Sequence, residues 1–256
     1  MVPPAVCGQD AETCGGKFGC VNQLYVASTD GGRPRRVSPV YYTGGDEGCS
    51  FDPSWSPDGT RLVFERASVD GADNLAVLSL KTGTVEPLHT EGEDAVWGKP
   101  GIAYLHMHAG RTNTEIGLMN PSTRRWSVLV DLRPAAGSLS WSARGDLATE
   151  QGRRIVVYSS SGRRIASFAP PLHTQAPAGV VWAPSGRQLL VCIDPIGGLS
   201  GRARTQRLQA RRKRDHLYHP PAATPFVVDA DGTHWRRLPL SGAEPLEAGC
   251  TATSWR

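Results

Sequence analysis

The sequence predicts an all-β protein, a five-bladed β-propeller of four-stranded antiparallel blades, and three observations support this prediction. Tryptophan recurs at a nearly constant interval, a tight turn with proline or glycine follows these tryptophans, and each interval holds several short apolar runs. Repeats of about 40–45 residues with four strands each are typical of propeller blades. We therefore expect one propeller domain over residues 1–256, carrying one insertion.

The tryptophan period sets the register of the repeat. The repeat tryptophans are Trp55, Trp97, Trp141, Trp182 and Trp255, separated by 42, 44, 41 and 73 residues. Their regular placement predicts that they pack one blade against the next and do not form a sugar-stacking set. Trp126 and Trp235 fall on the outer strands, where a surface role is open to them.

An inner hairpin begins each repeat. Its clearest copy is PSWSPDGTRLVF, residues 53–64, in which a strand ends at Trp55 and an apolar strand returns after the turn. Proline presets φ in such a turn and Gly59 supplies a position where φ can be positive. The same chemistry explains Asp58 as a turn residue.

An outer hairpin completes each repeat, with alternating apolar residues on both sides of a polar turn. The outer hairpins span residues 74–88, 114–129, 154–168 and 225–240, and a further one spans 22–37. The hairpin at 22–37 has no inner hairpin before it, and Thr251–Arg256 is an inner strand with no outer hairpin after it. We expect these N- and C-terminal segments to share one blade and so to close the ring.

The segment PSWSPDGTRLVF resembles the PD40 repeat of the TolB-like, or WD40-like, β-propeller family. VVDADGTHWRRLPL, residues 227–240, is similar to the outer strands of that family. The resemblance implies a propeller that is often extracytoplasmic. It does not imply one activity, because relatives include periplasmic binding proteins and the propeller gates of prolyl-oligopeptidase-like peptidases.

Cysteine usage predicts an oxidising compartment. The candidates for disulfide bonds are Cys7, Cys14, Cys20, Cys49 and Cys250. Cys250 lies beside the closing strand and can bond to Cys14 or Cys20, or the N-terminal cysteines can pair locally. Cys192 lies in the apolar run LLVCID and is expected to be a buried free thiol.

Targeting signals are consistent with export of a processed chain. No segment approaches the roughly 20 apolar residues of a membrane span. The first residues, MVPPAVCGQD, lack the apolar core of a signal peptide. We expect an extracytoplasmic protein, either secreted, periplasmic or at the cell surface, whose signal peptide is not present in this chain.

The long interval after Trp182 predicts an insertion over about residues 194–224. Its basic residues are Arg202, Arg204, Arg207, Arg211, Arg212, Lys213 and Arg214. Such a cluster can contact phosphates, acidic polysaccharide or an acidic protein face. The alternatives are a solvated loop without a partner and a site of proteolytic processing. Nucleic acid is not favoured, because no pattern of stacking aromatic residues accompanies the cluster.

Catalytic motifs are absent from the sequence. There is no GxSxG motif, no glycine-rich phosphate loop and no CxxC pair of the kind that binds zinc. His106 and His108 form an HxH that can hold a metal only where a third ligand converges, and we expect ordinary strand histidines. No cofactor and no metal site are predicted.

Carboxylates offer the one enzymatic alternative. Asp46, Glu47 and Asp52 lie around the start of the first inner hairpin, and Asp146 lies in the third. Some five-bladed propellers are glycoside hydrolases, which need carboxylates that converge on the central funnel. Three acidic groups within reach of one another at the ring axis would favour that reading.

The sequence thus favours a non-catalytic, extracytoplasmic propeller that acts as a binding or scaffold module for a protein partner or for self-assembly, with the basic insertion as the expected contact. The alternatives are a carbohydrate-active enzyme, either a glycoside hydrolase or a lyase, and the propeller accessory domain of a peptidase.

Overall fold

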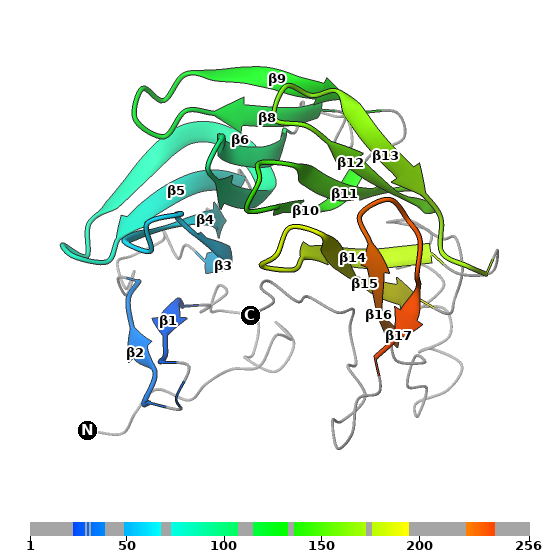
Figure 1. Ribbon diagram of the computed structural model, residues 1–256. Helices are drawn as coiled ribbons and strands as arrows, with labels where there is room; N and C mark the ends of the chain where they lie inside the picture. Colours follow the sequence, from blue (N-terminus) through cyan, green and yellow to red (C-terminus); the bar gives the residue numbers. More distant parts are fainter. Residues whose placement is uncertain are drawn as a thin grey trace, which may run out of the picture. The chain divides into compact units, whose positions relative to one another are not determined.

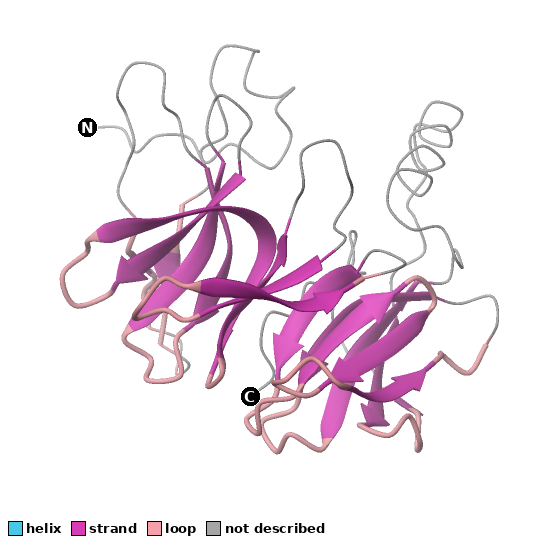
Figure 2. Cartoon of the chain, turned by 90° about the horizontal axis from the view of Figure 1, so that it is seen from above, coloured by secondary structure: helices cyan, strands magenta, loops and turns pink. Residues whose placement is uncertain are grey.

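The computed structural model describes residues 23–28, 30, 32–38, 49–67, 73–106, 115–132, 136–172, 176–194 and 224–238. These residues form strands and turns, with no helix among them (Figure 1, Figure 2). The described part accordingly contains no helix that could cross a membrane. The chain divides into two compact units, Met1–Trp97 and Gly98–Arg256, and each is described by itself.

Unit 1 contains two groups of antiparallel strands. Its strands are β1 (Tyr25–Val26), β2 (Arg35–Arg36), β3 (Cys49–Trp55), β4 (Arg61–Ala67), β5 (Asp73–Ser79) and β6 (Val85–Gly98), whose last residue belongs to unit 2. β1 pairs with β2, and β3 to β6 pair in chain order. The hairpin β1–β2 lies within residues 22–37, where an outer hairpin is predicted. Leu24, next to β1, packs into one apolar cluster with Leu62 and Phe64 of β4.

Unit 2 contains the larger number of strands. They are β7 (Gly101–His106), β8 (Glu115–Met119), β9 (Trp126–Asp131), β10 (Ala136–Trp141), β11 (Leu147–Gln151), β12 (Arg154–Tyr158), β13 (Arg164–Phe168), β14 (Ala176–Trp182), β15 (Gln188–Asp194), β16 (Thr224–Asp229) and β17 (Arg236–Arg237). β10 to β13 form one four-stranded antiparallel sheet in chain order, and β14 to β17 form a second. These two sheets are complete copies of the predicted four-stranded repeat.

Repeated turn chemistry fixes the inner hairpins. In the first of them, the Ser56 and Thr60 hydroxyls and the Thr60 N–H all donate to Oδ1 of Asp58, at 2.6, 2.8 and 3.0 Å. These hydrogen bonds, with that from Ser56 the largest cause, lower the pKa of Asp58 to about 2. Gly59 has φ of 68°. The turn role predicted for Asp58 is confirmed.

The start of each inner hairpin carries a β-bulge. The register shifts between Phe51 and Ser54 in β3, between Ala136 and Leu139 in β10, and between Pro177 and Val180 in β14. Each shift includes the residue three positions before the repeat tryptophan. A bulge bends its strand and re-aims the side chains there.

β6 joins the second strand of the outer hairpin at 74–88 to the inner strand that ends with Trp97 and Gly98. β6 runs without a turn for 14 residues. The chain changes direction through two residues with left-handed backbone, His89 at φ 53° and Asp94 at φ 52°. The blade count and the closure of the ring stay predictions, because Thr251–Arg256 lies outside the described residues.

The tryptophans divide by burial. Trp97 and Trp182 are only 7% and 5% exposed, which confirms their predicted packing role, and Trp141 is half-buried. Trp55 is 38% exposed, and the C-terminal segment of the blade predicted to adjoin it lies outside the described residues, so its packing role stays a prediction. The guanidinium carbon of Arg61 lies 4.7 Å from the centre of the Trp97 ring, and no described residue makes the corresponding contact with Trp55.

The core of the second unit joins its two complete sheets. Ala148, Ile155 and Phe168 of the sheet β10–β13 pack with Trp182 and Leu189 of the sheet β14–β17 in one cluster. β14 packs against β10, β11 and β12. The first strand of one sheet therefore lies on the inner strands of the sheet before it.

The prediction for Cys192 is wrong in one respect. The side chain is 1% exposed, as expected from its apolar run, but it is disulfide-bonded and not free. No other cysteine has a side chain among the described residues. The pairing of Cys7, Cys14, Cys20, Cys49 and Cys250 stays a prediction.

Serine side chains cap the N–H groups of the next inner strand. The Trp182 N–H donates to Oγ of Ser140 at 3.0 Å, 42 residues earlier, and the Val180 N–H donates to Oγ of Ser138 at 3.2 Å. In unit 1 the Trp97 N–H donates to Oγ of Ser54 at 3.0 Å. These N–H groups have no strand partner, so the serine oxygens complete their hydrogen bonding.

We expect Ser140→Ala to lower the free energy of unfolding by about 1–3 kcal/mol, because it leaves the buried N–H of Trp182 without an acceptor. Urea unfolding followed by circular dichroism measures this change. Ser161→Ala is the matched control, since Ser161 is exposed in the turn between β12 and β13. Equal effects of the two substitutions would contradict the capping role of Ser140.

Candidate functional site

A cluster of three carboxylates lies in unit 1. Asp52, Glu65 and Asp94 each bring one oxygen within 4.8 Å of the others. Asp52 and Asp94 occupy the same repeat position, three residues before Trp55 and Trp97, and both have positive φ, 43° and 52°. Glu65 lies on β4 and accepts a hydrogen bond from the Asp94 N–H.

Burial governs the charge of this cluster. Glu65 is 8% exposed, and burial, followed by the charges of Asp52, Asp94 and Glu93, raises its pKa to about 8 against the opposing effect of the Asp94 N–H. Burial is also the main cause that raises the pKa of Asp94 to about 6. Carboxylates this close can share a proton or bind a hard cation. A pKa near 8 means that Glu65 is mainly protonated at neutral pH, which favours a shared proton.

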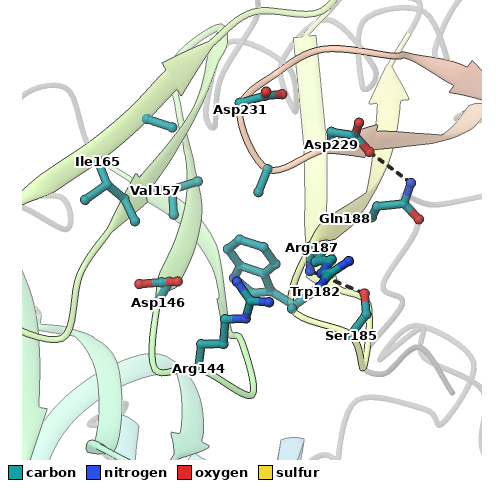
Figure 3. A pocket seen from close by; sticks show the side chains of 13 residues that line it. Arg144, Asp146, Val157, Ile165, Trp182, Ser185, Arg187, Gln188, Asp229 and Asp231 are labelled. Carbon is teal, nitrogen blue, oxygen red and sulfur yellow. Dashed lines mark hydrogen bonds between the residues drawn. The ribbon is translucent and has the colours of Figure 1, made fainter.

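A pocket of about 570 Å³ lies in unit 2, between the sheets β10–β13 and β14–β17 (Figure 3). The turns at one end of these sheets form it, together with the apolar side chains of β12 and β13. Its lining residues are Arg144, Asp146, Val157, Ile165, Ala166, Trp182, Ser185, Gly186, Arg187, Gln188, Asp229, Ala230 and Asp231.

At this pocket the turn of the inner hairpin differs in length from the corresponding turn in unit 1. Trp55 pairs with Leu62, whereas Trp141 pairs with Leu147, so the turn after Trp141 is one residue shorter. Arg61 and Asp146 are therefore equivalent, because each directly precedes the leucine paired with its tryptophan. In unit 1 this position places a guanidinium over the tryptophan of the next inner strand. In unit 2 it places a carboxylate in a pocket that Trp182 lines.

Charges of both signs face the pocket. Figure 3 shows Asp229, at the end of β16, and Asp231, in the turn after it, at one side, and Arg144 and Arg187 at the other. Asp229 accepts hydrogen bonds from Gln188 at 2.9 Å and from His234 at 2.8 Å, and Gln188 is the first cause that lowers its pKa.

Asp231 accepts a hydrogen bond from the Thr233 hydroxyl at 2.7 Å, the largest cause that lowers its pKa. Both aspartates are therefore ionised at neutral pH. The side chains of Arg144, Asp146 and Arg187, in contrast, have no hydrogen bond or ion pair within the described part of the chain.

The residues singled out in the sequence fall in several places. The basic residues of the insertion, from Arg202 to Arg214, lie outside the described residues, as do Asp46, Glu47 and His108. His106 lies 3.4 Å from Glu115, Nδ1 to Oε2, and its ring is 4.8 Å from that of Trp126, which is 45% exposed. Asp52 joins the carboxylate cluster, and Asp146 lines the pocket.

Sequence reasoning missed Glu65 and Asp94 of the cluster, and Arg144, Arg187, Asp229 and Asp231 of the pocket. The sequence does contain a sign of Asp94, because Asp94 and Asp52 each lie three residues before a repeat tryptophan. The shortened turn at 142–146 was also visible as a departure from the repeat. Glu65 had no signal, because only the fold brings β4 beside the end of β6.

Comparison with known proteins identifies the fold. No family model and no curated protein matches the sequence. Among solved structures, a protein assigned as TolB from Agrobacterium tumefaciens matches with a TM-score of 0.60 and 16% identity, over 84% of this chain and 73% of that one. TolB from Acinetobacter baumannii matches with a TM-score of 0.57 and 16% identity, over 84% of this chain and 48% of that one.

The chain has the fold of TolB-like β-propellers. The resemblance seen in its PD40-like repeats is thus confirmed at the level of the fold. The chain spans about half the length of the Acinetobacter protein. At these identities the likeness describes the fold and leaves the function to the sites of this chain.

We expect stability to fall as pH rises from about 4 to 8, to the extent that Glu65 and Asp94 determine it. Their pKa values in the folded chain lie above those in the unfolded chain, so their contribution is complete at low pH and is lost as each ionises. Glu65→Gln removes the larger share, at about 1.4 kcal/mol for each unit of pKa shift.

Urea unfolding between pH 5 and 9 tests this expectation, with the exposed Glu91→Gln on β6 as the control. The difference in unfolding free energy between Glu65→Gln and the original chain should increase with pH. A difference independent of pH would show that Glu65 is already ionised in the folded chain.

Proposed function

We propose that this chain is a non-catalytic binding module that recognises a protein partner through the pocket between the sheets β10–β13 and β14–β17. The observation that carries the proposal is a preformed recess lined by Arg144, Asp146 and Arg187, whose charged groups make no hydrogen bond or ion pair with any other described residue. Charged side chains with no intramolecular partner do not contribute to folding through ion pairs, and they remain available to a ligand.

The size and lining of the pocket support this proposal. Its volume of about 570 Å³ falls within the range of about 300–1,000 Å³ that is usual for ligand sites. Val157, Ile165 and Ala166 give it an apolar wall, and Ile165 is 43% exposed. An apolar wall with a few charged groups at its rim is a common design of recognition sites.

The basic insertion at 194–224 supplies a further proposed contact, for an acidic face of the partner or of a second copy of the chain. The disulfide-bonded Cys192 is consistent with an extracytoplasmic location, since such bonds persist in oxidising compartments. Arg211→Glu, Arg212→Glu and Arg214→Glu, made together, should weaken partner binding or self-assembly, measured by analytical ultracentrifugation. Unchanged association would remove the insertion from the proposal.

We expect the double substitution Arg144→Glu and Arg187→Glu to abolish binding of the partner. The reference is the partner that the unaltered chain captures. Affinity capture with quantitative mass spectrometry makes the measurement, and purified chain in ultracentrifugation covers self-assembly. Arg163→Glu with Arg236→Glu is the matched control, because it makes the same charge change on exposed residues of the same two sheets outside the pocket. Equal losses in both variants would reject the pocket as the contact.

The carboxylate cluster bears on the alternative of a carbohydrate-active enzyme. Catalytic carboxyl groups of glycosidases stand about 5–5.5 Å apart in retaining enzymes and about 6.5–9.5 Å apart in inverting ones. The three carboxylates here each bring one oxygen within 4.8 Å of the others, and Glu65 is buried, which limits its contact with a substrate. Hydrolysis of a glycoside panel that Glu65→Gln abolishes, with folding retained, would establish the enzyme over the binding module.

A further inference from the structure

The pocket corresponds, by its place in the repeat, to the contact between the hairpin β3–β4 and the end of β6 in unit 1. There the guanidinium carbon of Arg61 lies over the ring of Trp97, 4.7 Å from its centre, so the chain itself supplies a cation to this ring. A cation over a tryptophan face is attracted by the ring, by about 0.5–2 kcal/mol depending on exposure. The equivalent residue in unit 2 is Asp146, so the chain supplies no cation from this position beside Trp182.

The charges of the pocket discriminate among classes of ligand. Three carboxylates line it, Asp146, Asp229 and Asp231, and the hydrogen bonds to the last two keep them ionised. A phosphate-rich polymer would meet these carboxylates at close range, which is unfavourable. A metal ion would meet the two guanidinium groups. A ligand with both a cationic and an anionic group satisfies the two sides together.

The arrangement in Figure 3 gives the order of these groups. Asp229 and Asp231 lie at one side, and Arg144 and Arg187 lie at the other, where Trp182 also lies. A carboxylate has about four lone-pair sites, so Asp229 and Asp231 can accept further hydrogen bonds beyond those they already make. Arg144 and Arg187 can each bind a carboxylate through two parallel hydrogen bonds.

We propose that the pocket binds an extended polypeptide segment in which a basic side chain neighbours an acidic one. The basic group takes the place beside Trp182 that Arg61 takes over Trp97, against Asp146, Asp229 and Asp231, and the acidic group binds Arg144 and Arg187. This proposal rests on the proposed function as a protein-binding module, and it names the chemistry of the segment that the module recognises.

The test uses defined peptides and the full chain. A capped peptide with adjacent arginine and glutamate is titrated by ligand-detected NMR, beside one in which citrulline replaces arginine and one in which glutamine replaces glutamate. Citrulline keeps the shape of arginine and removes its charge. We expect each replacement to weaken binding about tenfold, the equivalent of about 1.4 kcal/mol. The proposal would be overturned if the citrulline peptide bound as tightly as the peptide with arginine and glutamate. It would also be overturned if free arginine bound as tightly as that peptide.

Variants of the chain test the place of the cation. Asp146→Arg restores the residue type of the unit 1 repeat and should abolish peptide binding, because the chain then fills its own pocket. Asp146→Asn keeps the side-chain shape and should weaken binding about tenfold. Asp131→Asn, on the exposed face of β9, is the matched control and should bind as the unaltered chain does. Unchanged binding by Asp146→Asn would overturn the assignment.

The two proposals fail in different ways. If the peptides show no charge dependence but Arg144→Glu with Arg187→Glu still loses the captured partner, the binding module stands and the chemistry of its segment is wrong. If that pair of substitutions has no effect beyond its control, the pocket is not the contact, and both proposals fail.

Discussion

Edge strands set the main constraint on this fold. β10 and β14 each begin a sheet, so one side of each strand carries N–H groups that no strand pairs. A buried N–H without an acceptor costs about 1–3 kcal/mol. Ser138 and Ser140 of β10 supply acceptors to Val180 and Trp182 of β14, and the oxygens of Glu150 in turn hold Ser138. The hydrogen bonds that pair the edge N–H groups of β14 thus also fix the position of the sheet β14–β17 on the sheet β10–β13.

The same joint permits variation at its turn. Because the serines hold the strands, the residues just beyond Trp141 are free to change without moving β14. The turn after Trp141 is one residue shorter than that after Trp55, and Asp146 stands where the repeat has Arg61. The result is a recess lined by charged side chains, of which Arg144, Asp146 and Arg187 have no partner among the described residues, next to a packed core. One fold can host many binding sites when its strands keep the same arrangement and the turns at their ends vary.

The sequence was informative where the chemistry is local and uninformative where it depends on neighbours in space. The period of the tryptophans and the turn at Ser56–Gly59 were sufficient to predict the hairpins, because strand alternation and turn geometry are properties of short segments. They could not predict that β6 continues to Gly98, since two left-handed residues replace a turn there. The bonding of Cys192 and the pocket beside Trp182 depend on which segments meet, and no short pattern reveals that.

Aspartate and glutamate have opposite electrostatic roles at the two sites, and the cause is solvent. In unit 1 burial raises the pKa of Glu65 to about 8, so that the cluster lowers its charge by holding a proton. In unit 2 Asp229 and Asp231 lie at the surface, where hydrogen bonds lower their pKa values and keep them charged. A carboxylate that stays ionised and open to solvent can attract a charged partner, whereas a buried, protonated one cannot. The pocket in unit 2 is therefore the better candidate for recognition, and the cluster in unit 1 is better explained as part of the packing between inner strands.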